Sequence, residues 1–581
     1  MSTYSAPLEE YEFLLEQLLN YTTIAALPGY EDADLAMVKE LLPEAAKFFE
    51  HEVAPSNHPS DQAGSHLVDG KVQVPEMIAT LHPKLVEAGW MALASQPEYG
   101  GSGFPNLVAL AVNEMAQSSN VAYSLLAMLS QGVIHALDLY GSEAQKQQYL
   151  PNLVSGVWAG TMNLTEANAG SDLSAVATKA VPEGDHFLIS GQKIFITWGD
   201  HELSENIIHL VLARTPDAPP GTKGISMFIV PKYLINSDGS LGERNDVKAI
   251  STEHKLGIHA SPTCVMQYGD DAGAIGYLVG EENKGLVYMF AMMNQARLAV
   301  GHQGVSVSER AYQQALAYAK ERIQGTVAGQ KAPIIAHDDV RRMLLTMRAL
   351  TEAARAISFY AISCQDKAMR HPDSEVQAAQ QTLLDVATPL VKSWCTEIAL
   401  EVTSLGVQVH GGMGFIEETG AAQHERDCRI FPIYEGTNGI QALDFIGRKC
   451  LRDGGDGIRL LLADMVNFCQ SSKHEAELNA AIKQCQEALE WLLAHPKESP
   501  AVAFDFMMLF ANTLAGSLMA AAHQKAEAAI AAGSSSKFLQ RKVATADFFI
   551  HHLLPRNGAY MAGILSPVAL GDFQAWLDES A

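Results

Sequence analysis

Basic residues are scarce in this chain. Its 581 residues include 40 Lys and Arg against 66 Asp and Glu, a formal net charge of −26. Nucleic acids and anionic membranes bind to surfaces with a positive footprint. The composition therefore excludes nucleic acid as the main partner, but it leaves room for a local basic pocket that binds a phosphorylated ligand.

Cysteine is also sparse, and its pattern is uninformative. The seven cysteines are odd in number and form no CxxC pair. Neither a disulfide framework nor a metal site is indicated, and buried thiols in a reducing compartment are expected. The first residues show no basic segment followed by an apolar run, so no export signal is visible and we expect a cytoplasmic protein.

Long apolar runs are nearly absent. Phe506 to Ala522 is free of charge over 17 residues, but Asn512, Thr513 and Ser517 interrupt it. A membrane-spanning helix needs about 20 predominantly apolar residues. We therefore predict a buried helix of a helical bundle here, and no stable membrane insertion.

The residue pattern of the chain changes twice. Apolar residues at helical spacing dominate up to about Trp158, short β-branched and aromatic runs follow, and helical patterns return from Leu286. No GxGxxG opens a helix and no βαβ alternation appears, which disfavours a Rossmann fold. We predict an α+β, mainly α fold, with a helical domain over 1–160, an antiparallel β domain over 161–290, a helical bundle over 291–450 and a further helical domain over 458–581.

Several short motifs combine small residues with groups that bind ligands. "LTEANAGSD" begins at Leu164, and "KIFITWGD" places Phe195 and Thr197 on one face of a strand. "ARLAVGHQG" contains Arg297, and "VQVHGGMGF" has a histidine before two glycines. Taken singly, each is explained equally well by a turn, a half-buried strand, a surface Arg or a structural histidine.

The segment "IYEGTNGIQ", 433–441, holds one acid, Glu435, between an aromatic residue and a Gly-Thr-Asn sequence. One interpretation is a surface carboxylate at a polar turn. The other is a catalytic base whose position is set by the polar residues that follow it.

The order of these motifs decides between the interpretations. LTExxAGSD, K-x-F-I-T, M-x-x-x-R, ERxQ, Q-x-x-GG-x-G and IYEGTNxxQ follow one another along the chain. This ordered set resembles the acyl-CoA dehydrogenase family, over residues 40 to 450. The extra helical tail resembles the larger bacterial branch of that family, which includes 3-methylthiopropanoyl-CoA dehydrogenases.

The resemblance implies a non-covalently bound FAD and a set of residues that contact it. The residues expected to contact FAD, some of them from a neighbouring subunit, are Met162, Leu164, Thr165, Phe195, Thr197, Arg322, Gln324, Gln408, Gly411, Gly412, Thr437 and Asn438. Those expected to contact the acyl-CoA substrate are Ser171, Arg297 and Tyr434. An FAD shared between subunits implies a homodimer or homotetramer.

The resemblance also implies the chemistry. Glu435 would remove the α-proton of an acyl-CoA thioester, and the β-hydrogen would pass as hydride to flavin N5, giving a trans-2-enoyl-CoA. Hydrogen bonds to the thioester carbonyl and burial of the carboxylate would make this proton transfer feasible. The position that carries the base in some other members is Ala296 here, which cannot accept a proton. An electron-transfer flavoprotein would then accept the electrons.

Three alternatives remain at this point: a flavin-dependent acyl-CoA oxidase that uses O₂, a family-like binding protein that protects nucleic acid, and a non-catalytic scaffold. The net charge and the presence of Glu435 oppose the second of these. The acyl chain, the choice between dimer and tetramer, and the role of the C-terminal helices are not readable from the sequence.

Overall fold

The computed structural model describes residues 4–566, which form two compact units. Unit 1 comprises the described parts of Met1–Glu44, Pro105–Glu114 and Val300–Ala581. Unit 2 comprises Ala45–Phe104 and Met115–Ala299. The helices α3 (Leu35–Phe48), α6 (Asn106–Ser119) and α9 (Gly285–Glu321) continue from one unit into the other.

Unit 2 is built on an eight-stranded sheet with the order β10-β11-β5-β12-β7-β6-β3, and β4 also pairs with β5. Its strands are β3 (Trp158–Asn163), β4 (Lys179–Glu183), β5 (His186–Thr197), β6 (Asn206–Ala213), β7 (Ser226–Pro231), β10 (Val247–Thr252), β11 (Thr263–Tyr268) and β12 (Ala274–Leu278). Every residue of β6 and β7 is buried, as expected for strands covered on both faces.

One ladder of this sheet departs from the antiparallel prediction. β3 pairs with β6 in parallel, from Trp158 opposite Asn206 to Asn163 opposite Val211, whereas the other ladders of the sheet that the structure describes are antiparallel. A parallel pair needs a long crossover connection. The chain supplies it here, because β4 and β5 lie between the two strands in the sequence.

Helices accompany the sheet of unit 2. They are α4 (Asn57–Ala63), α5 (Glu76–Ala88), α7 (Val121–Tyr140) and α8 (Glu143–Ser155). α7 packs on β3, and Ser142 begins α8 with a capping box in which Ser142 and Gln145 exchange hydrogen bonds. A hairpin of β1 (His66–Val68) and β2 (Lys71–Gln73), which the helical prediction for 1–160 missed, also lies in this unit.

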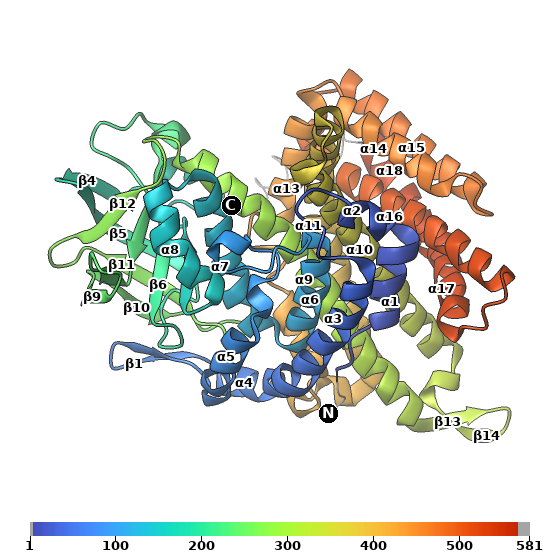
Figure 1. Ribbon diagram of the computed structural model, residues 1–581. Coiled ribbons are helices and arrows are strands. Elements are labelled where there is room, and N and C mark those ends of the chain that lie inside the picture. The colour runs from blue at the N-terminus through green and yellow to red at the C-terminus, as the bar shows by residue number, and fades with distance from the viewer. Residues whose placement is uncertain (1–3, 567–581) are drawn as a thin grey trace, which may run out of the picture. The chain divides into compact units, whose positions relative to one another are not determined.

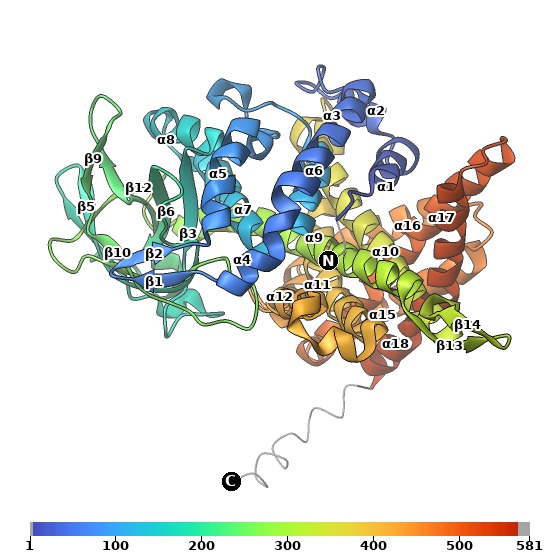
Figure 2. The same ribbon diagram turned by 90° about the horizontal axis from the view of Figure 1, so that it is seen from below.

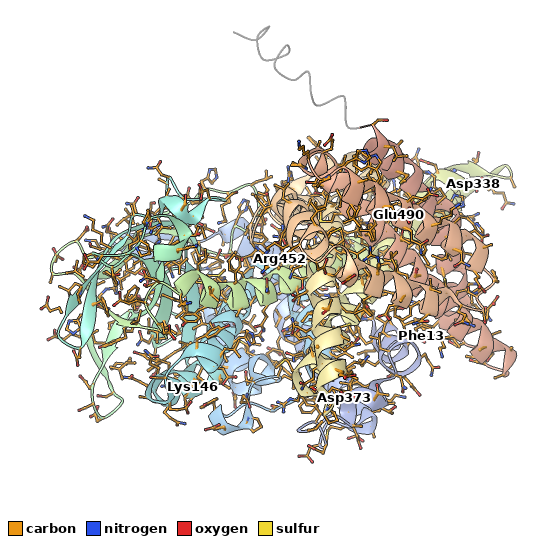
Figure 3. All side chains as sticks on the ribbon, turned by 90° about the horizontal axis from the view of Figure 1, so that it is seen from above. Phe13, Lys146, Asp338, Asp373, Arg452 and Glu490 are labelled. Atoms are coloured by element: carbon orange, nitrogen blue, oxygen red, sulfur yellow. The ribbon has the colours of Figure 1, made fainter. Side chains whose placement is uncertain are left out.

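Unit 1 is helical. It contains α1 (Leu8–Phe13), α2 (Tyr21–Ala25), α10 (Asp338–Arg370), α11 (Ser374–His410), α12 (Ala421–Cys428), α13 (Asn438–Ile446), α14 (Asp456–Cys469), α15 (Glu475–Ala494), α16 (Ser499–Ala531), α17 (Lys537–Phe548) and α18 (Asn557–Leu565). α10 and α11 pack along each other, and the orange and red helices at the C-terminal end gather around α16 (Figure 1). Asp338 begins α10 beside a hairpin of β13 (Ile323–Val327) and β14 (Gln330–Pro333), as Figure 3 shows.

The predicted buried helix over 506–522 is confirmed as the middle of α16. α16 and α7 are the two helices of the described chain that are long and apolar enough to cross a membrane. The most apolar stretches of these helices are 89% and 67% buried, respectively, within the protein. Core helices of a globular protein have this property, and the seven cysteines, which are all buried and form no disulfide, agree with the predicted free thiols.

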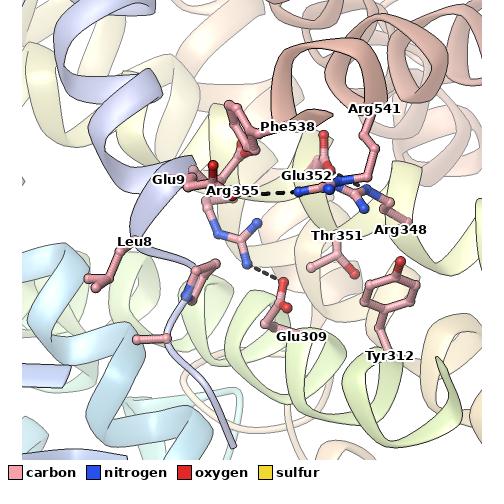
Figure 4. A pocket seen from close by; sticks show the side chains of 13 residues that line it. Leu8, Glu9, Glu309, Tyr312, Arg348, Thr351, Glu352, Arg355, Phe538 and Arg541 are labelled. Carbon is pink, nitrogen blue, oxygen red and sulfur yellow. Dashed lines mark hydrogen bonds and ion pairs between the residues drawn. The ribbon is translucent and has the colours of Figure 1, made fainter. Parts of the chain in front are cut away.

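A cluster of buried charges joins distant segments of unit 1. Arg355 on α10 donates to Glu114 at 2.8 Å and to Glu309 at 2.7 Å. Close by, the Lys542 ammonium on α17 pairs with Glu10 on α1 and with Glu352 on α10. These groups adjoin a cavity of about 270 Å³ that Figure 4 shows at close range, and none of the residues lining it is a predicted site residue.

Candidate active site

Glu435 lies in the loop between α12 and α13, with its backbone in a strained conformation. Its φ is +55°, and Gly436 follows at +85°. A left-handed φ is uncommon for a residue with a side chain and costs of order 1–3 kcal/mol unless the surroundings enforce it. The surrounding structure therefore holds Glu435 in a backbone conformation that a residue with a side chain rarely adopts.

The residues after Glu435 hold the loop in place. Thr437 is the N-cap of α13 and accepts a hydrogen bond from the Ile440 backbone N–H at 3.2 Å. The Gln441 side chain donates to the Glu435 carbonyl at 3.4 Å. Helix α13 therefore begins immediately after the acid and fixes its backbone from the C-terminal side.

Asn438 anchors the same loop to α11. Its Oδ1 accepts from the Lys392 ammonium at 2.8 Å, and its Nδ2 donates to Glu397 at 2.8 Å and to Thr396 at 3.0 Å. Lys392 is fully buried and Asn438 is 4% exposed. The side-chain amide of Asn438, which was predicted to contact the flavin, thus makes its hydrogen bonds to residues of α11. Through these bonds it holds the Glu435 loop in position.

Tyr434, the residue before the acid, is also held by unit 1. Its hydroxyl donates to the Gln303 side chain on α9, and its ring stacks on Phe431 at a centroid distance of 6.1 Å. Desolvation, with a contribution from the Glu435 carboxylate, raises the pKa of the phenol well above its usual value. Tyr434 therefore remains a neutral hydrogen-bond donor at physiological pH.

The double glycine lies at the C-terminal end of α11. Gly411 has φ +60°, and apart from the adjoining residues and the nearby helix backbone no atom of the described chain lies within 4 Å of a Cβ built on Gly411 or Gly412. Gln408, one turn earlier, is exposed. His410 donates from Nδ1 to the Gly406 carbonyl at 2.7 Å and stacks on Tyr318, so it is a satisfied structural histidine. The glycines leave open space where a ligand can approach the backbone.

Arg322 and Gln324 lie where α9 ends and the β13–β14 hairpin begins. Both side chains are exposed, and the Arg322 guanidinium donates to Gln324 Oε1 at 3.4 Å. The hairpin projects from the ends of α9 and α10 in Figure 2. Exposed polar side chains on a projecting hairpin are accessible to a second molecule, as the predicted contact with a neighbouring subunit requires.

In unit 2, the segment from Met162 to Glu166 is fastened to β5. The Ile194 N–H donates to the Thr165 carbonyl at 2.9 Å, and the Lys193 ammonium donates to the Leu164 carbonyl at 3.0 Å. Lys193 also pairs with Glu166 at 2.8 Å. This buried pair fixes the backbone of the predicted flavin contacts.

The end of β5 carries the predicted aromatic wall. Phe195 is 59% exposed with φ +60°, beside a register shift in the β5–β11 ladder, and Thr197 is half-buried. Ile196 and Trp198 are buried, and the Trp198 indole donates to the Ala122 carbonyl at 3.2 Å. The alternation therefore leaves Phe195 and Thr197 accessible, as the period of two predicted.

The predicted substrate contacts of unit 2 differ in accessibility. Ser171 is exposed in the loop after β3, whereas Arg297 on α9 is 4% exposed. Ala296, at the alternative base position, is 6% exposed and offers no proton acceptor. Met289 and Met292 are buried in the core of the unit.

The structure brings the predicted residues together in two sets. Unit 1 holds Glu435, Tyr434, Thr437, Asn438, Gln408, Gly411, Gly412, Arg322 and Gln324, and unit 2 holds Met162, Leu164, Thr165, Ser171, Phe195, Thr197 and Arg297. Sequence reasoning missed Lys392 and Gln303, which position the Glu435 loop. A lysine inside the apolar pattern of α11 was the available signal for Lys392, because a buried lysine needs a partner.

Four family models match the chain. The acyl-CoA dehydrogenase N-terminal, middle and C-terminal domains match residues 37–157, 161–270 and 283–451, respectively. A domain described as acetyl-CoA dehydrogenase C-terminal like matches residues 461–568. Together they account for most of the chain, including the extra C-terminal helices.

Individual relatives agree with these matches. A 3-methylmercaptopropionyl-CoA dehydrogenase from Ruegeria pomeroyi is 47% identical over 570 residues, covering 95% of this chain and 96% of that protein. A butyryl-CoA dehydrogenase from Syntrophomonas wolfei is 32% identical, covering 95% of each chain. The fold also matches an acyl-CoA dehydrogenase from Bacillus anthracis solved with FAD, with a TM-score of 0.76 at 22% identity, covering 94% of this chain and 90% of that one. The chain therefore belongs to the acyl-CoA dehydrogenase family of oxidoreductases, as its ordered motifs predicted.

Proposed function

We propose that this enzyme removes the α- and β-hydrogens of an acyl-CoA thioester, giving the trans-2-enoyl-CoA, with Glu435 as the base. The observation that carries the proposal is the strained backbone of Glu435, held from one side by the N-cap at Thr437 and by the buried bonds of Asn438. Exposed Asp69 at a hairpin turn has a similar φ of +49°, so the anchoring of the Glu435 loop by Thr437 and Asn438, and not the φ alone, distinguishes Glu435 from a surface carboxylate.

Each unit, taken by itself, offers groups of the kind that bind FAD. A solvent-exposed Phe195 and a neighbouring hydroxyl offer a surface to a planar ring, and Gly411 and Gly412 leave space for the backbone to approach a pyrophosphate. Arg322 supplies an exposed guanidinium of the kind that binds phosphate. When bound, FAD would accept the β-hydrogen with its electron pair.

The chain itself supplies the base and its positioning. Glu435 would take the α-proton on its carboxylate, and Tyr434, held by Gln303, would line the acyl site as a neutral phenol. A general base contributes about 10²- to 10⁴-fold to the rate when it is held within hydrogen-bond reach of the proton. The anchoring of the loop by Asn438 serves that requirement.

We further propose a short or sulfur-containing acyl chain, with 3-methylthiopropanoyl-CoA and butyryl-CoA as the leading substrates. The support is the sequence identity of 47% and 32%, each over 95% of this chain, to relatives named for these two substrates. In this proposal the predicted domains, 1–160, 161–290, 291–450 and 458–581, are an N-terminal helical domain, the flavin-binding sheet, the catalytic bundle and an added helical domain.

The experiment is an anaerobic titration of the yellow protein with a panel of acyl-CoA thioesters, read by bleaching of the flavin absorbance. We expect bleaching by 3-methylthiopropanoyl-CoA and butyryl-CoA, and little by palmitoyl-CoA. The matching free acids, which lack the thioester that makes the α-proton acidic, serve as the control and should leave the flavin oxidised. A colourless protein, or one that no thioester bleaches, would contradict the proposal and favour a scaffold.

We propose an electron-transfer flavoprotein as the electron acceptor, a homodimer or homotetramer as the assembly, and the cytoplasm as the location. The exposed Arg322 and Gln324 support an FAD shared between subunits. An oxidase would instead release hydrogen peroxide in step with enoyl-CoA, so measuring peroxide during aerobic turnover distinguishes the two.

Lys392 provides a test of the positioning of the base. We expect Lys392→Met to retain FAD but to slow flavin bleaching about 10-fold, because Asn438 loses one of the bonds that anchor the Glu435 loop. Two quantities are measured for each variant: the rate of flavin bleaching at saturating acyl-CoA, and the acyl-CoA concentration that gives half of this maximal rate. A fall in the rate at nearly unchanged half-saturation indicates a misplaced base.

The control for Lys392→Met is Lys449→Met. Lys449 pairs with Asp385 at 2.8 Å and is partly exposed, and it makes no bond to the Glu435 loop. Equal slowing in both variants, or a loss of folded protein that explains the whole effect, would contradict a positioning role for Lys392.

A further inference from the structure

A group of ligand-type side chains lies among the C-terminal helices of unit 1. His474 is the N-cap residue of α15, His523 lies in α16 and Asp547 lies in α17. One ligand atom from each lies within 4.8 Å of the other two. Three separate segments of the chain thus bring two imidazoles and a carboxylate to one point, outside the catalytic loop.

The imidazole of His523 makes no hydrogen bond in this arrangement, although two carboxylates lie close to it. The residue is fully buried, and neither ring nitrogen makes a hydrogen bond within the described chain. Its Nε2 lies 3.3 Å from Asp547 Oδ1, and its Nδ1 lies 3.5 Å from Glu527 Oε2. Leaving a buried polar group unsatisfied costs about 1–3 kcal/mol, and a cation bound at Nε2 would offset part of that cost.

The same carboxylate oxygen faces the other histidine. His474 Nε2 lies 2.7 Å from Asp547 Oδ1, and His474 is 2% exposed. Both imidazoles therefore present Nε2 to one oxygen. Neutral imidazole and carboxylate are the usual ligands of Zn²⁺ and similar divalent transition metals.

We propose that His474, His523 and Asp547 bind a divalent transition-metal ion of the Zn²⁺ type, with Nε2, Nε2 and Oδ1 as ligand atoms. Glu527 supports the site, because a carboxylate beside Nδ1 of a metal-bound histidine fixes the ring orientation and the tautomer. The role is structural: the ion would fasten the start of α15 to α16 and α17.

Lys473 competes with the metal. Its ammonium lies 3.0 Å from Asp547 Oδ1 and 3.8 Å from Glu527 Oε1. The side chain is 45% exposed, so it can move into solvent or onto Glu527 when a cation occupies the site. This arrangement predicts that Lys473 weakens metal binding.

The test uses the FAD-loaded enzyme, stripped with EDTA and titrated with ZnCl₂ by calorimetry, with bound zinc then measured after desalting. We expect one tight zinc per chain and a higher midpoint of thermal unfolding, since an ion that binds the folded state stabilises it. Asp547→Asn and His474→Gln each remove a proposed ligand and should each weaken zinc binding by about 100-fold. This is the upper end of the loss seen when a residue that only supports a ligand is changed. Lys473→Met should tighten it about 10-fold.

The controls separate this site from adventitious binding. His495→Gln removes an exposed histidine of the same domain that stacks on Trp491, and it should leave the affinity unchanged. Because His523 is in the core and its variant can fail to fold, Asp547→Asn, at a side chain that is 33% exposed, carries the test. Absence of saturable binding, or binding that Asp547→Asn and His474→Gln leave unchanged, would overturn the proposal.

Discussion

Glu435→Gln is expected to keep FAD and to bind acyl-CoA, yet to lose about 10²- to 10⁴-fold in the rate of flavin bleaching. The amide has nearly the same size and can occupy the same strained position, but it cannot accept the α-proton. Stopped-flow absorbance at saturating acyl-CoA measures the effect directly. The loop should be intact in this variant, because Thr437 and Asn438 keep their bonds.

Two results would remove Glu435 from its role. One is normal flavin bleaching in Glu435→Gln. The other is an equal loss of bleaching rate in Glu418→Gln, which changes an exposed acid in the short turn before α12. Loss of FAD from Glu435→Gln would also speak for a structural acid. An unchanged flavin spectrum with no bleaching is the outcome that the proposal requires.

Among the variants proposed here, Arg355→Met is expected to cause the largest loss of stability, about 3–5 kcal/mol or more in the free energy of unfolding. Arg355 is 1% exposed and bonds Glu114, which is fully buried, and Glu309. Without the guanidinium, the two carboxylates are left without their main cation in a low-dielectric interior. Thermal unfolding and the yield of soluble protein measure the loss.

The same helix offers a matched control. Arg341 on α10 pairs with Asp338 at 3.8 Å, and both side chains are largely exposed. Arg341→Met should change stability by less than about 1 kcal/mol, because solvent screens such pairs. Replacing Arg355 and Glu114 together by methionine should recover part of the loss, and an Arg355→Met protein as stable as Arg341→Met would contradict the argument.

Much of the fold was predictable from local patterns. The capping box at Ser142, the buried helix around Phe506 to Ala522 and the exposed faces of Phe195 and Thr197 all follow from spacing and residue type. The family followed from the order of the motifs. In each case the information lies within a few residues along the chain, where helix and strand periodicities apply.

The positions of the ionic groups were not predictable in this way. Arg355 and Glu114 are 241 residues apart in the sequence, and Lys542 and Glu10 are 532 apart. Lys392 appeared as one lysine in an apolar helix, and its role emerged only from its bond to Asn438. The parallel pairing of β3 with β6 was likewise not predictable, because it depends on where β6 is placed in the sheet after the chain has formed β4 and β5.

The sequence by itself determined the family, the succession of helical and β segments, and the candidate base Glu435. Tertiary structure alone decided that the Glu435 backbone is strained, that α11 anchors its loop, and that His474, His523 and Asp547 meet. The physical reason is that periodicity and capping act over a few residues. A buried ion pair or a metal site depends instead on contacts between segments that only packing brings together.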